Sequence, residues 1–251
     1  MGRKKRKRGR IRDRTVIIGL AALALLIGML YFRNTRQTAD VSKPAPIQAA
    51  APIESKKQTQ GARTNKKDPL LTLVNGKNPL PKGWKADLVP LEGEHSIDRR
   101  AYPGLKKMLE DARAAGLDPL ICSSYRTNEL QTRLFNEQVK AYQNRGYEKE
   151  AAEREAAVWV AVPGTSEHQT GLAADIVSVS NQNLNHSQEN TAVQKWLMKN
   201  CWKYGFILRY PSDKNSITGI GYEPWHYRYV GKQAAKEIYE QSVCLEEYLR
   251  Q

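Results

Sequence analysis

The chain has 251 residues, of which 40 are Lys or Arg and 26 are Asp or Glu, so its net charge is +14. A hydrophobic content of 40% excludes a wholly disordered chain, and three cysteines exclude a disulfide-rich scaffold. The charge is unevenly distributed: residues 1–14 carry +8, residues 33–68 carry +5 and residues 69–251 carry only +1. Because the longest part of the chain is nearly neutral, a nucleic-acid-binding function is disfavoured.

Residues 15–32 form an uncharged run of 18 residues, mostly Leu, Ile, Val and Ala. As a helix, such a run spans roughly 27 Å, close to the hydrocarbon core of about 30 Å. It predicts an uncleaved transmembrane anchor; a cleaved signal peptide is the alternative, although no small-x-small site follows closely. The nine basic residues in 1–14 predict a single-pass protein of the cell membrane, with a cytoplasmic N-terminus and residues 33–251 outside the cytoplasm.

Residues 33–68 are rich in Ala, Pro, Gln, Thr and Lys without apolar periodicity, which predicts a disordered linker. From residue 69 to 251 the pattern predicts one domain. Helices are expected over 102–112, 128–142, 148–160, 192–204 and 234–249, and strands over 119–122, 172–179, 206–210 and 227–230. Thr127 is the expected N-cap of the second helix, and Gly116 the expected C-cap of the first. This irregular alternation predicts an α+β fold, with a small antiparallel sheet and flanking helices.

Two of the four histidines lie in patterns suited to a metal. His168 precedes Asp175 by seven residues, and Glu223 precedes His226 by three. Zinc hydrolysis needs three protein ligands, an open position for water and a further carboxylate as base. The sequence therefore predicts a zinc site of His168, Asp175 and His226 with Glu223 as base, where Gly171 lets the chain bend. The other two histidines are interpreted as surface residues: His95 and His186.

These residues resemble a known family. The pattern Ser-x-His-x-x-Gly-x-Ala-x-Asp is met by Ser166, His168, Gly171, Ala173 and Asp175. It is similar to the first zinc motif of the VanY-type D-alanyl-D-alanine carboxypeptidases, which belong to the LAS group of zinc peptidases. The segments 223–226 (Glu-Pro-Trp-His) and 206–211 also fit the family. Residues 123–126 resemble its Ser-Gly-Tyr-Arg segment, with Ser124 in place of Gly. The resemblance covers roughly residues 78–249.

The resemblance implies Zn²⁺ on His168, Asp175 and His226, Glu223 as the catalytic base, and Arg126 as the residue that stabilises charge on the substrate. An always-charged guanidinium suits an oxyanion or a terminal carboxylate. Further candidate substrate contacts are Gln131, Ser166, Tyr125 and Ser124. The implied reaction is removal of the terminal D-alanine from peptidoglycan stem peptides.

Several alternatives stay open at this point. A D-Ala-D-Ala dipeptidase, an L,D-carboxypeptidase or an endopeptidase would use the same zinc site, and a non-catalytic cell-wall-binding module would retain the fold. Oligomeric state is not indicated. An extracytoplasmic domain allows one disulfide among three cysteines: Cys122, which is expected to be buried, Cys201 and Cys244.

Overall fold

The computed structural model describes residues 68–250. The predicted cytoplasmic tail (1–14) and membrane span (15–32) lie outside the described residues, as does the linker (33–68) up to its last residue. Within residues 68–250, none of the helices has both the length and the apolar character needed to cross a membrane. The described chain corresponds to the domain predicted from residue 69 onward.

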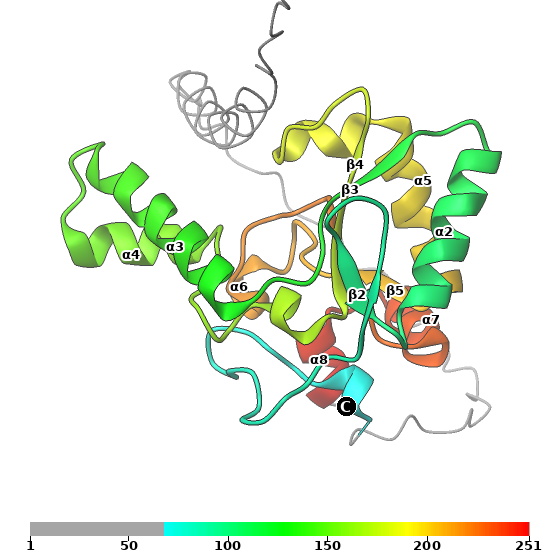
Figure 1. Ribbon diagram of the computed structural model, residues 1–251, viewed down its shortest axis with the longest axis horizontal. Helices are drawn as coiled ribbons and strands as arrows, with labels where there is room; N and C mark the ends of the chain where they lie inside the picture. Colours follow the sequence, from blue (N-terminus) through cyan, green and yellow to red (C-terminus); the bar gives the residue numbers. More distant parts are fainter. Residues whose placement is uncertain (1–67, 251) are drawn as a thin grey trace, which may run out of the picture. The chain divides into compact units, whose positions relative to one another are not determined.

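A four-stranded antiparallel sheet lies at the centre of this domain (Figure 1). Its strands run in the order β3 (Pro119–Ser123), β4 (Ala173–Ser178), β6 (His226–Tyr229) and β5 (Phe206–Leu208). All six residues of β4 are buried, because chain covers both faces of this strand. A separate two-stranded antiparallel sheet, which the sequence did not predict, is formed by β1 (Leu88–Pro90) and β2 (Ser96–Asp98).

Helices flank the central sheet, as expected for the α+β class. Figure 1 shows α2 (Tyr102–Ala114) and α5 (Ala192–Asn200) on one side, while the hairpin of α3 and α4 extends from the other. The main core lies between the sheet and α2, with Leu105, Met108 and Ile176 fully buried. The remaining helices and 3₁₀ turns are α3 (Asn128–Gln143), α4 (Lys149–Ala157), α6 (Asn215–Thr218), α7 (Lys232–Gln241), α8 (Leu245–Arg250), η1 (Pro69–Leu71), η2 (Glu167–Thr170), η3 (His186–Asn190) and η4 (Cys201–Tyr204).

Capping residues recognised in the sequence correctly predicted where two helices begin or end. The Thr127 side chain accepts a hydrogen bond from the backbone N–H of Leu130 at 3.2 Å, as expected of an N-cap. Gly116 follows α2 with a φ of 77°, a left-handed conformation that favours glycine. The helix predicted over 148–160 is shorter, since α4 ends at Ala157.

The single helix predicted over 234–249 is wrong. The chain forms two helices, α7 and α8, separated at Ser242, which has a φ of 53°. The break lets the apolar residues of both helices pack into one cluster, because Ile238 and Tyr248 contact the same core. A straight helix would carry the second apolar group away from the domain.

The three cysteines are unpaired. Cys201 and Cys244 are buried. Cys122, which was expected to be buried, is half-buried. Burial raises the pKa of the Cys201 thiol to about 12, so this side chain is protonated and unreactive at neutral pH. The disulfide that the sequence allowed is not formed.

Candidate metal centre and catalytic site

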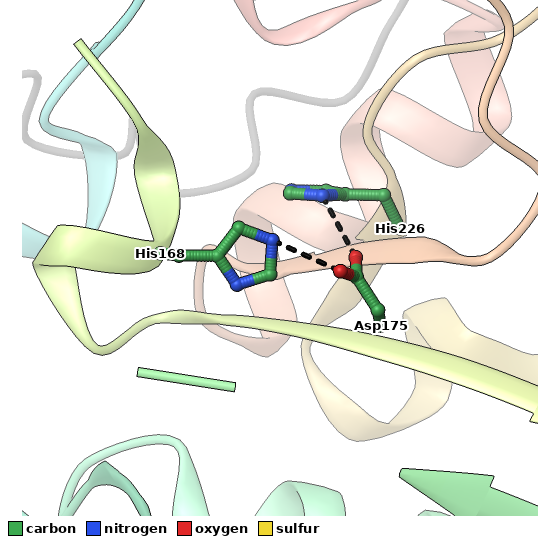
Figure 2. A group of neighbouring side chains, drawn as sticks. All are labelled: His168, Asp175 and His226. Carbon is green, nitrogen blue, oxygen red and sulfur yellow. Dashed lines mark ion pairs between the residues drawn. The ribbon is translucent and has the colours of Figure 1, made fainter. Parts of the chain in front are cut away.

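Two adjacent strands bring the first pair of predicted ligands together. Asp175 on β4 and His226 on β6 are direct partners in the antiparallel register, so their side chains project from neighbouring positions of one face. The Nδ1 atom of His226 lies 3.1 Å from Oδ1 of Asp175. Figure 2 marks this ion pair between the two side chains.

The third predicted ligand comes from the turn before β4. His168 lies in η2 and approaches Asp175 from the opposite side, with 3.2 Å between His168 Nε2 and Asp175 Oδ2 (Figure 2). Gly171 makes this approach possible, because its φ of 76° turns the chain from η2 into β4. The Gly171 carbonyl also accepts a hydrogen bond from the backbone N–H of Asp98 at 2.8 Å, which ties the turn to β2.

The three side chains fit a zinc ion. One ligand atom from each of His168, Asp175 and His226 lies within 4.8 Å of the others, and all three residues are buried. Oδ1 of Asp175 is buried without a hydrogen-bond partner, which is costly unless a cation binds there. Two imidazoles and one carboxylate, with a fourth position left for water, form the donor set of catalytic zinc sites.

The surroundings of each imidazole decide which nitrogen faces the metal position. The Ser124 carbonyl accepts a hydrogen bond from the Nδ1–H of His168 at 2.7 Å, which leaves the Nε2 lone pair free. Burial lowers the pKa of His168 to about 4, so this ring is neutral at pH 7. His226 presents Nδ1 instead; burial opposes its charged form, but the adjacent carboxylates of Asp175 and Glu167 raise its pKa to about 9.

The predicted base lies beside the ligands. Oε2 of Glu223 is 3.5 Å from Nδ1 of His226, and the Glu223 side chain is about one-tenth exposed. Burial, and to a smaller extent the nearby charge of Asp175, raise the pKa of Glu223 to about 8. A carboxylate with a high proton affinity next to a metal position is suited to accept and return a proton at neutral pH.

Arg126 reaches the same centre from the loop after β3. Its Nη2 donates a hydrogen bond to Oδ2 of Asp175 at 2.8 Å, its Nε donates to Oγ of Ser123 at 2.8 Å, and its Nη1 donates to Oε1 of Gln131 at 3.4 Å. About one-sixth of the side chain is exposed. These bonds hold the guanidinium at the edge of the metal centre.

The other predicted substrate contacts differ in accessibility. Gln131 is fully buried and donates from Nε2 to the Ala161 carbonyl at 2.7 Å, so its contacts orient Arg126. Ser124 and Ser166 are also buried. Tyr125 is half-buried. Direct substrate contact by these four residues stays a prediction.

The two histidines predicted to be surface residues, His95 and His186, are both half-buried. The ring of His186 packs beside Tyr222 and Trp159, with centroid separations of 5.2 Å and 6.4 Å. Among the described residues, neither His186 nor His95 joins the metal-ligand group.

The sequence interpretation missed a buried charge network beneath the site. Glu167 accepts hydrogen bonds from Arg209 and Arg228, each at 2.7 Å. Arg209 also donates to both carboxylate oxygens of Glu246, at 2.7 and 2.8 Å. One signal was present: Arg228 follows His226 by two residues on β6, so both project from the same face of that strand. Buried arginines are unusual, and the position of Arg228 on the same strand face as His226 indicated that its side chain lies near the metal centre.

A buried His-Asp-His group with an adjacent carboxylate on an α+β scaffold defines a metal-dependent hydrolase centre. A family model described as VanY, D-alanyl-D-alanine carboxypeptidase, matches residues 94–232. The chain belongs to this family. It is a VanY-type D-alanyl-D-alanine carboxypeptidase, and zinc is the cofactor indicated by its donor set and by one structural neighbour in complex with Zn(II).

Individual relatives agree with this assignment. A D-alanyl-D-alanine carboxypeptidase of Enterococcus faecalis is 46% identical over 201 residues, which cover 80% of this chain and 73% of that protein. A solved structure of a VanY variant from a VanB-type resistance cassette, in complex with Zn(II), has a TM-score of 0.67 at 46% identity, covering 72% of this chain and 99% of that one.

Two further solved structures are similar to this chain. VanYB in complex with D-alanine-D-alanine has a TM-score of 0.66 at 47% identity, covering 72% of this chain and 97% of that one. The LD-carboxypeptidase LdcB, whose structure addresses peptidoglycan recognition, has a TM-score of 0.64 at 41% identity, covering 73% and 88%. The predicted fold class of the domain and the predicted family are both confirmed.

Proposed function

We propose that this protein is a membrane-anchored, zinc-dependent enzyme that removes the terminal D-alanine from peptidoglycan stem peptides. The observation that carries the proposal is the position of Glu223, a buried carboxylate 3.5 Å from the metal-facing nitrogen of His226. His168, Asp175 and His226 are the proposed zinc ligands. A non-catalytic wall-binding module would not need a carboxylate held in this position.

Each proposed catalytic residue has a definite task. When bound, zinc supplies Lewis-acid polarisation of a carbonyl and lowers the pKa of a water molecule. Glu223 removes a proton from the attacking water while the oxygen of that water bonds to the carbonyl carbon. Glu223 then delivers that proton to the nitrogen of the departing D-alanine as the carbon–nitrogen bond breaks. Arg126 stabilises the negative charge that develops on the substrate.

The substrate assignment draws on the relatives as well as on the site. A D-alanyl-D-alanine carboxypeptidase at 46% identity and a neighbour bound to D-alanine-D-alanine support a substrate that ends in D-Ala-D-Ala. The likeness to LdcB supports L,D-carboxypeptidase activity as the second candidate. The shape of the substrate pocket decides between these specificities, and both place a peptide carbonyl over the same ligands.

The proposed location follows from the N-terminal sequence. The uncharged run 15–32 anchors the chain, and the basic residues of 1–14 keep the N-terminus in the cytoplasm. Residues 33–68 then tether the enzyme outside the membrane, at a distance from the bilayer that allows contact with the cell wall. Membrane fractionation with protease accessibility on intact cells tests this: the C-terminal domain should be cleaved by external protease.

The catalytic assignment is tested with purified full-length protein and two synthetic peptides, one ending in D-Ala-D-Ala and one ending in a single D-alanine. Mass spectrometry should show loss of one D-alanine from the first peptide in the presence of zinc. Glu223→Gln should bind zinc and lose at least about 100-fold of the rate. Glu110→Gln, which removes an exposed carboxylate on α2, is the matched control.

Other products would change the assignment. Release of the intact D-Ala-D-Ala dipeptide would identify a dipeptidase, and cleavage of the second peptide alone would identify an L,D-carboxypeptidase. A wild-type rate in Glu223→Gln would refute the role of Glu223 as the base.

A further inference from the structure

Glu167 is a buried carboxylate with two differently engaged oxygens. Its Oε1 accepts hydrogen bonds from Arg209 Nε and Arg228 Nη1, each at 2.7 Å. Its Oε2 is buried and has no hydrogen-bond donor among the described residues. The side chain has no exposed surface. An anionic oxygen left in this state inside a protein is costly, unless a nearby group supplies a proton donor.

The nearest such group belongs to a proposed metal ligand. Nε2 of His226 lies 3.4 Å from Oε2 of Glu167, at the outer limit of a hydrogen bond. Nε2 is itself buried without a hydrogen-bond partner in the described chain. The two unsatisfied atoms therefore complement each other, one as a donor and the other as an acceptor.

The charge balance keeps Glu167 ionised. Two arginines, Arg209 and Arg228, and two glutamates, Glu167 and Glu246, form a closed buried network with no net charge. Arg228 also donates from Nη2 to the carbonyls of Leu70 and Thr72, at 3.0 and 2.9 Å. These bonds fix the guanidinium groups, and the guanidinium groups in turn fix Oε1, so Oε2 has little freedom to turn away from His226.

The two imidazoles of the centre thus have analogous supports. A backbone carbonyl accepts from the Nδ1–H of His168, which frees its Nε2. For His226 the orientation is reversed, because Nδ1 faces Asp175 and Nε2 faces Glu167. In metal sites, an acceptor on the far nitrogen of a ligating histidine fixes its tautomer and its ring orientation.

We propose that Glu167 is a positioning residue of the metal centre, which accepts the Nε2–H of His226 and so holds Nδ1 unprotonated and directed at the metal. The buried network of Arg209, Arg228 and Glu246 is the support that keeps Glu167 in place. This inference rests on the proposed function in one respect, namely that His226 is a zinc ligand.

The first test observes the histidines of the wild-type protein directly, with one variant used for assignment. With four histidines in the whole chain, ¹⁵N-histidine-labelled, zinc-loaded protein gives a spectrum that can be assigned, and His226 is identified as the signal lost in His226→Gln. We expect zinc coordination at Nδ1 and a slowly exchanging, downfield Nε2–H proton. Zinc coordination at Nε2, or an Nε2–H that exchanges rapidly with water, would overturn the inference without affecting the assignment of zinc.

The second test compares two isosteric variants of the same network. Glu167→Gln places an amide NH₂ or a neutral oxygen opposite His226, and we expect the zinc dissociation constant to rise about 10- to 100-fold, with an upfield shift or loss of the Nε2–H signal. Glu246→Gln removes one negative charge from the same network, but the hydrogen bonds of the Glu246 side chain run to Arg209 and Asn75 rather than to His226. It should raise the zinc dissociation constant less than Glu167→Gln does and should keep the Nε2–H signal, because Glu167, the acceptor of that proton, is still present.

The outcomes separate a positioning role from a structural one. If Glu167 only supports the fold, both variants lose stability and both change the zinc dissociation constant to the same extent, which would overturn the inference. If wild-type protein binds no zinc, the proposed function and this inference fail together. Zinc binding in wild-type protein with an equal affinity in Glu167→Gln refutes the positioning role alone.

Discussion

Replacing Gly171 by alanine tests whether the turn between η2 and β4 positions His168. Gly171 has a φ of 76°. An alanine held in this left-handed region lowers the free energy of unfolding by about 1–2 kcal/mol. A Cβ atom at this position would also lie 3.0 Å from the Cβ of Ala86 and 3.3 Å from the backbone N of Asp98. Because backbone must move to relieve the second contact, overpacking adds about 1–3 kcal/mol. The expected total loss is about 2–5 kcal/mol.

Gly116 offers a matched control. Its φ is 77°, and an added Cβ would meet no atom within 4 Å. Gly116→Ala therefore has the backbone penalty alone, about 1–2 kcal/mol. The difference between the two variants isolates the close approach of Gly171 to Ala86 and Asp98, since the change in unfolded-chain entropy is the same in both.

The assay is urea-induced unfolding of the purified full-length protein, followed by tryptophan fluorescence. All five tryptophans lie in residues 84–225, so the signal reports on the catalytic domain. Zinc affinity measured by chelator competition should also fall in Gly171→Ala, because the displaced turn carries His168. Equal losses of stability in the two variants, together with unchanged zinc affinity in both, would refute this account of the turn.

Three further outcomes are expected. Arg126→Lys keeps the charge but loses the guanidinium bonds to Asp175 and Gln131, so steady-state kinetics should show a fall in kcat/KM of about 10- to 100-fold; an unchanged value would contradict the proposed role. Removal of zinc by a chelator should abolish D-alanine release and lower the melting temperature, and added zinc should restore both; activity that survives chelation would exclude zinc dependence. Glu246→Gln should lose about 1.5–3 kcal/mol of stability at pH 7, and the difference from wild type should shrink in urea titrations below about pH 4; a difference independent of pH would argue against an ionised Glu246.

The sign of that pH dependence follows from the direction of the shift. Burial would raise the pKa of Glu246, but Arg209 outweighs this and lowers it below the ordinary value of 4.5. A carboxyl group whose pKa is lower in the folded state stabilises the protein above its unfolded pKa. That contribution is lost as the pH falls through the folded-state pKa. The exposed pair of Lys107 and Asp111 on α2 should contribute little at any pH.

Much of the site could be read from local patterns. The spacing of His168 and Asp175, and of Glu223 and His226, indicated a zinc hydrolase. The ability of an imidazole or a carboxylate to bind a metal or accept a proton belongs to the side chain itself and can be recognised without knowing the fold. The N-cap at Thr127 and the glycine at 116 likewise depend on bonds within a few residues. Such short-range requirements are expressed directly in the order of residues.

The arrangement of these parts depends on contacts between distant segments. Asp175 and His226 are adjacent because of the register between β4 and β6, which no local signal specifies. Glu167 meets Arg228 across 61 positions and Glu246 meets Arg209 across 37, and a buried charge is tolerated only where its partners converge in three dimensions. The amino-acid order therefore indicated which groups could do the chemistry, and packing of the sheet determined how they are aligned, because burial and charge compensation are properties of the assembled core.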